Sequence, residues 1–231
     1  MSENLLLAIS NEYKSNQRVR RNRIRAFAEG YFARAALGQH ALWKSLYDDK
    51  PLGPKVHSAL RSYLTQRTNR CAYCQDRIFH NANVNIDHIL PKAIFPQFTF
   101  TDENLIAACV TCNAIKSDDD FYGVATNEMN YDKHKANWGS FHPRHHLYDD
   151  HIRMIAVQTN YFYVRAFVGK TPEGSNLCNL FLNKVTDFGT KAQANAKIAQ
   201  AVVSLENLLA ASGGVQIPAV QKLLANLVAN I

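Results

Sequence analysis

Glycine is scarce in this chain of 231 residues, which contains only ten. None of them lies in a glycine-rich phosphate-binding loop or in the Gly-x-Ser-x-Gly pattern of a nucleophile elbow. The sequence therefore argues against a nucleotide hydrolase and against a serine hydrolase.

Long apolar runs are also missing. The run from Leu5 to Ile9 is far shorter than a membrane span, and it lacks the basic flank of a secretory signal peptide. Hydrophobic residues make up 47% of the chain and charged residues 19%, a balance typical of a globular protein with its own core. We therefore expect no membrane association and a cytoplasmic location.

Basic residues outnumber acidic ones by 26 to 19, and their placement is uneven. The segment from Lys14 to Arg25 contains no acidic residue and includes Arg18, Arg21 and Arg25. Such a run is either a solvated helix face or a surface for a polyanion. Because arginine forms bidentate contacts with phosphate, we predict that Arg18, Arg21 and Arg25 bind nucleic acid.

Four of the five cysteines form two pairs, Cys71-x-x-Cys74 and Cys109-x-x-Cys112. Without a secretion signal, paired cysteines indicate a metal site rather than disulfides, and four thiolates match tetrahedral Zn²⁺. The 34 residues between the pairs require a substantial folded element there. We expect the fifth, Cys178, to be a buried small side chain, because it lies in the apolar stretch from Leu177 to Leu182.

Hydrophobic periodicity and turn residues divide the chain into three regions: a basic helical region at 1–66, a core at 67–135, and a C-terminal region of strands followed by helices at 136–231. The elements expected after the first region are short strands at 78–79 and 84–86, a short helix through Asn113 and Lys116, a strand at 158–168 and two helices broken at Gly213-Gly214.

A specific motif stands between and after the cysteine pairs: Asp87-His88-x-x-Pro91, then Asn104-Leu105, then Asn113 and Lys116 directly after Cys112. In this order the elements resemble the HNH endonucleases of the ββα-metal superfamily, in particular the branch with four zinc-binding cysteines. The resemblance covers residues 71–116. It implies an α+β fold with a zinc-clamped ββα-metal core, flanked here by helical N- and C-terminal regions. A looser resemblance links the later His-Pro motif and trailing helices to HNH nucleases of bacterial anti-phage defence systems.

Phosphodiester hydrolysis gives each of these residues a role. His88 can act as the general base, because imidazole is largely neutral near pH 7. Asp87 and Asn113 offer oxygen ligands for one catalytic Mg²⁺ or Mn²⁺. Adjacent residues on a regular strand point to opposite faces, so the strand must twist or end at Asp87-His88.

The resemblance also assigns two supporting residues. It makes Asn104 the asparagine that braces the loop and helps to orient the His88 ring. Lys116 would steer a phosphate or protonate the leaving group through water, or else is an ordinary lysine on a helix surface.

These features predict a metal-dependent HNH endonuclease that hydrolyses DNA, with RNA left open as a substrate. Two alternatives remain: a zinc-dependent nucleic-acid-binding module without catalysis, and a nuclease subunit that is active only with a partner such as an ATPase. The polar cluster from His142 to His151 is a second metal site, part of the substrate wall, or a hydrogen-bonded loop. Leu223 and Leu227 lie on a nearly uncharged terminal helix, for which we predict self-association or a partner interface.

Overall fold

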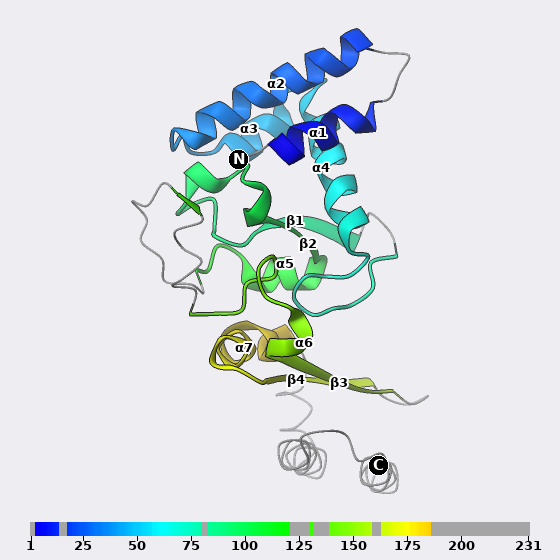
Figure 1. The fold of residues 1–231 in the computed structure, drawn as a ribbon, viewed down its shortest axis with the longest axis vertical. Helices are drawn as coiled ribbons and strands as arrows, with labels where there is room; N and C mark the ends of the chain where they lie inside the picture. The colour runs from blue at the N-terminus through cyan, green and yellow to red at the C-terminus, as the bar shows by residue number, and fades with distance from the viewer. Residues whose placement is uncertain are drawn as a thin grey trace, which may run out of the picture.

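The computed structural model describes residues 3–13, 18–79, 83–120, 130–131, 139–158 and 163–185. The molecule has three layers along its long axis (Figure 1). The first is a layer of N-terminal helices, the second a two-stranded sheet with one helix beneath it, and the third a hairpin with short helices. The helices predicted around Gly213-Gly214, with Leu223 and Leu227, lie outside the described residues.

The N-terminal layer confirms the helical interpretation of the first region. It comprises α1 (Glu3–Glu12), α2 (Arg18–Ala36), α3 (Leu42–Asp48) and α4 (Gly53–Arg67). Apolar residues at helical spacing on α4, among them Val56, Leu60 and Leu64, are buried. Gly53 lets α4 begin directly against α3, since a Cβ there would lie 1.7 Å from the Leu46 carbonyl oxygen. Close packing of the two helices thus depends on this glycine.

The central unit consists of an antiparallel pair, β1 (Val84–His88) and β2 (Leu105–Cys109), followed by α5 (Val110–Lys116). The predicted helix through Asn113 is confirmed. The predicted strand at 78–79 is wrong: Arg70 and Arg77 form an isolated bridge, and the partner of β1 is β2. The apolar pair 78–79 misled the prediction, because Ile78 is buried whereas Phe79 is 84% exposed and packs in no sheet. Between the strands lie two short 3₁₀ helices, η2 (Pro96–Phe98) and η3 (Asp102–Asn104).

The C-terminal hairpin pairs β3 (Ile152–Gln158) with β4 (Tyr163–Gly169) in antiparallel register. The single strand predicted at 158–168 is therefore wrong in extent: its second half is β4, and β3 was missed. The flanking elements are α6 (Tyr148–His151), α7 (Pro172–Leu177), a π-helical turn η5 (Cys178–Leu182) and α8 (Asn183–Val185).

One hydrophobic core joins these layers. Phe32 of α2 stacks on Phe100 in the β1–β2 connection with ring centroids 4.5 Å apart, and Tyr73 packs on Phe181 at 5.0 Å. Cys178 is 3% exposed, as predicted. Among the described residues, none of the helices has both the length and the apolar character needed to cross a bilayer.

Candidate active site and metal centre

The four paired cysteines come together at the junction of the β1–β2 sheet and α5. Their sulfur atoms all lie within 4.8 Å of one another, and Cys74 Sγ is 3.9 Å from Cys109 Sγ. A tetrahedron with Zn–S bonds of about 2.3 Å has sulfur–sulfur edges of about 3.8 Å. The four thiols therefore fit a tetrahedral ion of the size of Zn²⁺.

The pKa values of the four thiols also favour metal binding. Hydrogen bonding from Cys112 and its neighbours lowers the pKa of Cys109, while proximity to Cys109 raises the pKa of Cys74 and of Cys112. Once one thiolate forms, the others resist ionisation, and a bound cation would remove that resistance. Such a donor set can hold a metal ion.

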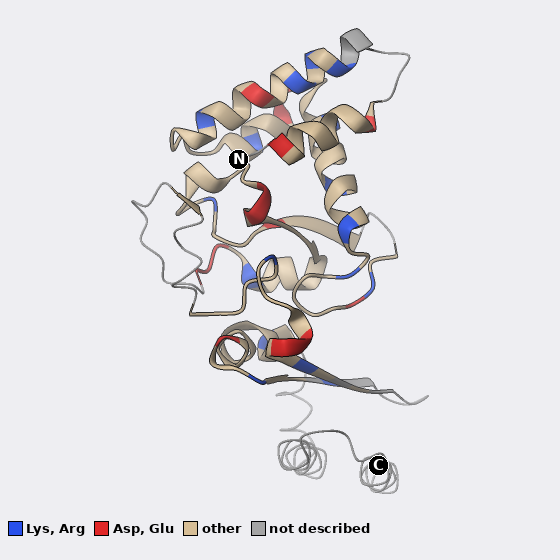
Figure 2. Cartoon of the chain, in the orientation of Figure 1, with Lys and Arg blue, Asp and Glu red and all other residues tan. Residues whose placement is uncertain are grey.

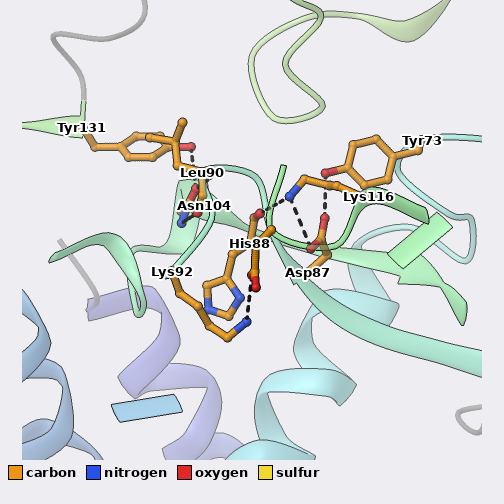
Figure 3. Close-up of polar contacts among 9 residues, drawn as sticks. Tyr73, Asp87, His88, Leu90, Lys92, Asn104, Lys116 and Tyr131 are labelled. Carbon is orange, nitrogen blue, oxygen red and sulfur yellow. Dashed lines mark hydrogen bonds and ion pairs between the residues drawn. The ribbon is translucent and has the colours of Figure 1, made fainter. Parts of the chain in front are cut away.

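Asp87 is 6% exposed near the end of β1. Tyr73 donates a hydrogen bond of 2.7 Å to Asp87 Oδ2, and the Lys116 ammonium lies 3.7 Å from Oδ1 (Figure 3). Burial raises the pKa of Asp87, and the charge of Lys116 opposes that shift. The two contacts favour the ionised carboxylate that a hard metal ion requires.

Lys116 itself requires a correction. The residue is 0% exposed, burial lowers its pKa, and its Nζ donates a 2.8 Å hydrogen bond to the main-chain oxygen of His88. It is neither a surface lysine nor open to a phosphate. The sequence gave no sign of this burial, because a lysine on a short helix can equally well face water or, as here, bond the end of β1.

His88 is 3% exposed and is the last residue of β1. Its Nε2 lies 3.0 Å from the main-chain oxygen of Thr99. Because a carbonyl only accepts, Nε2 carries the proton and Nδ1 holds the lone pair. Trp43 meets the ring edge-on, with centroids 4.7 Å apart. Burial, assisted by the charge of Lys92, holds the pKa of His88 well below 6.5, so the ring is neutral near pH 7.

Asn104 braces the connection between β1 and β2. Its Oδ1 accepts a 2.7 Å hydrogen bond from Leu90 N, and its Nδ2 donates to the main-chain oxygen of Leu90 (Figure 3). Nδ2 also donates to the main-chain oxygen of Phe98. It thus holds the loop as expected, but the His88 ring is hydrogen-bonded by Thr99 instead. Asn104 contacts both sides of this ring's surroundings: its main-chain oxygen accepts from Ile89 N, next to His88, and its side chain bonds Phe98, the residue before Thr99.

A cavity of about 440 Å³ brings the motif residues together. Asp87 and His88 from β1 and Asn113 from α5 line it. Adjacent residues of a regular strand point to opposite faces, but β1 ends at His88. Asp87 and His88 therefore both line the cavity. One cavity therefore contains a neutral histidine and two oxygen ligands.

Comparison with protein-family models matches residues 71–119 to the HNH endonucleases. Residues 71–119 are an HNH endonuclease domain. Searches among curated proteins and among solved structures found no match to the chain. The domain implies a nucleic-acid substrate and a nuclease-like function. The resemblance to anti-phage nucleases stays a prediction.

The predicted arginine surface lies apart from the HNH domain cavity. Arg25 binds Glu3 and Glu29, each at 2.8 Å, and Glu29 is the one acidic residue among the arginines of α2 (Figure 2). The side chain of Arg18 is outside the described part, and Arg21 is half-buried. Neither Arg21 nor Arg25 lines the cavity.

The cluster from His142 to His151 lies beside the HNH domain; His142 is buried, the other histidines are half-buried, and Asp149 and Asp150 are exposed. His142 Nε2 lies 2.9 Å from Tyr131 Oη, which donates to Asn104 Oδ1 at 3.3 Å. His142 stacks on His145, and burial lowers the pKa of His142. Within the described ranges, only the four cysteines group three or more potential metal ligands. The geometry favours the hydrogen-bonded loop among the three interpretations.

Sequence reasoning missed Trp43, His57 and Arg61, which line the cavity from α3 and α4. His57 and Arg61 stand four residues apart, a spacing that places them on one helix face. That spacing is the only signal, and it does not say which face meets the HNH domain.

Proposed function

We propose that the chain is a metal-dependent endonuclease that hydrolyses phosphodiester bonds in DNA. The observation that supports it most directly is the meeting of Asp87, His88 and Asn113 in one cavity of an HNH domain. A module that only binds nucleic acid has no need of a buried neutral histidine beside two oxygen ligands.

His88 is the general base of this proposal. The Thr99 carbonyl keeps the proton on Nε2, so Nδ1 is the atom that accepts a proton from the attacking water. A lowered pKa keeps Nδ1 unprotonated over the whole neutral range. Trp43 and Thr99 together restrict the ring to one orientation.

Asp87 and Asn113 would hold one Mg²⁺ or Mn²⁺, since a carboxylate and an amide oxygen leave room for waters and phosphate oxygens. That ion would supply Lewis-acid stabilisation of the phosphate and of the leaving oxygen. Lys116 and Tyr73 keep Asp87 available in its ionised form. Zn²⁺ on Cys71, Cys74, Cys109 and Cys112 would hold β2 and α5 in place.

The arginines of α2 belong to the proposal as contacts outside the cavity. Arg18 and Arg21 would bind DNA phosphates, and Arg25 would join them only by exchanging its bonds to Glu3 and Glu29. These contacts would add affinity without sequence preference.

The test is cleavage of supercoiled plasmid DNA with Mg²⁺ or Mn²⁺, by the wild type and by His88→Ala. We expect the wild type to cut, and the variant to lose about 10²- to 10⁴-fold in rate, because the general base is gone. Zinc content and DNA affinity should stay near wild type. The matched control is His40→Ala, which removes an exposed histidine.

Three other outcomes would contradict the proposal in different ways. Equal cleavage by His88→Ala would remove His88 from the mechanism. A wild type that binds DNA but cuts nothing would favour the binding module. Cleavage that begins only when a cell extract is added would favour a partner-dependent subunit.

A further inference from the structure

The cavity of the HNH domain has a second wall that the domain itself does not supply. Trp43 of α3 and His57 and Arg61 of α4 line it together with the motif residues. α4 packs directly against β1 and β2, as Figure 1 shows, so this wall is fixed to the catalytic strand. The N-terminal helices are therefore part of the site.

The positive charges in this cavity are not equivalent. The Lys92 ammonium lies 3.8 Å from the carboxylate of Asp118. Burial, assisted by the charge of Arg61, lowers the pKa of His57 to about 4, which leaves that ring neutral near pH 7. Of the basic side chains that line this cavity, His57 is thus neutral and Lys92 is already matched by an acid.

Arg61 differs from them. It is half-buried, and its Nε is buried without a hydrogen-bond partner in the described part of the protein. No carboxylate within ion-pairing distance of Arg61 is found among the described residues. Because Arg61 also lines the cavity beside Asp87 and His88, its guanidinium charge is available to an anion that enters the cavity.

We propose that Arg61 binds the scissile phosphate of the nucleic acid. A guanidinium matches two phosphate oxygens in a bidentate geometry, and it stays charged at any pH at which the protein folds. From α4 it reaches a phosphate held in the same cavity as Asp87 and Asn113, and it stabilises the negative charge that develops as water attacks. The cavity of about 440 Å³ lies within the range of about 300–1,000 Å³ typical of ligand sites. The inference rests on the proposed nuclease function and adds a binding residue from outside residues 71–119.

The test compares Arg61→Ala, Arg61→Gln and Arg61→Lys in the full chain loaded with zinc. Single-turnover cleavage is measured with Mg²⁺ at saturating DNA, so that weaker binding does not set the rate. We expect Arg61→Ala and Arg61→Gln to lose on the order of 10²-fold, the effect of removing one donor to a developing negative charge. Arg61→Lys should fall between them and wild type, because it keeps the charge but loses the bidentate contact. The matched control is Lys55→Ala, which removes a positive charge from the same helix outside the cavity.

Wild-type rates in Arg61→Gln at saturating DNA would overturn the proposal, and so would an equal loss in Lys55→Ala. If the wild type itself does not cut, the nuclease function fails, but the phosphate contact is still tested by DNA binding without divalent metal. The slope of log K against log salt should then fall in magnitude by about 0.9 in Arg61→Gln, the value for one lost phosphate contact. An unchanged slope would exclude Arg61 from phosphate binding.

Discussion

At the scale of single residues, the buried polar groups at the end of β1 depend on one another. Lys116 Nζ bonds the His88 main-chain oxygen and faces the Asp87 carboxylate, which also accepts from Tyr73. Both members of the Lys116–Asp87 pair are less than 8% exposed in their side chains. Either charge left alone there would be costly, since both side chains are largely withdrawn from water.

Lys116→Met therefore should destabilise the fold by about 3 kcal/mol, the typical cost of removing one partner from a buried pair. Urea unfolding of the zinc-loaded protein measures this loss, with Lys55→Met as the control on a half-buried lysine of α4. Adding Asp87→Asn should restore part of the stability, because the uncompensated carboxylate is then gone. No destabilisation in Lys116→Met would show that the pair has no structural role.

At the scale of elements, α5 is too short to be stable alone. It has seven residues, whereas isolated helices in water need about 12–15 residues even to be marginal. Cys109 is its N-cap, and the Cys109 sulfur accepts a hydrogen bond from Cys112 N at 3.4 Å. The same atom belongs to the four-sulfur cluster, so metal binding and helix formation are coupled.

Cys109→Ser is consequently expected to be insoluble or unfolded, rather than folded and inactive. Elemental analysis of the wild type should find one tightly held zinc per chain, and a strong chelator should abolish its cooperative thermal transition. The matched control is Cys178→Ala, which changes a buried cysteine outside the cluster and should keep the zinc. A soluble Cys109→Ser protein of full stability would remove the zinc clamp from the proposal.

At the scale of the whole molecule, buried neutral histidines make the fold sensitive to acid. His57 on α4, His88 on β1 and His142 beside the HNH domain all have pKa values below 6.5, in each case chiefly because of burial. The unfolded chain binds protons at these positions below about pH 6.5 and the folded chain does not. The free energy of unfolding therefore falls as the pH falls below 6.5.

His57 allows this to be measured at one residue. Its folded pKa of about 4 places its contribution to the loss between pH 6.5 and pH 4. In His57→Gln the drop in unfolding free energy between pH 7 and pH 4.5 should be smaller than in wild type, by up to about 2 kcal/mol. Urea titrations at the two pH values measure this, with the exposed His40→Gln as control. Equal drops in His57→Gln and wild type would contradict the assignment.

The sequence by itself determined the HNH motif, the grouping of the cysteines and the helical first region. These features are local, because few residue types can be metal ligands and because helical periodicity is visible in neighbouring residues. Asp87, His88, Asn104 and Asn113 could all be named because each occupies a fixed place relative to the cysteine pairs.

Only the tertiary structure decided which strand pairs with β1, that Lys116 is buried, that Arg25 is matched by Glu3 and Glu29, and that Arg61 enters the cavity. Each depends on a contact between segments far apart in the chain, and a charged side chain looks the same in the sequence whether it faces water or a buried carboxylate. The packing of α1 on α2, of α5 on β1 and of α4 on the sheet settles these questions, because it determines which groups lose their water and which partners replace it.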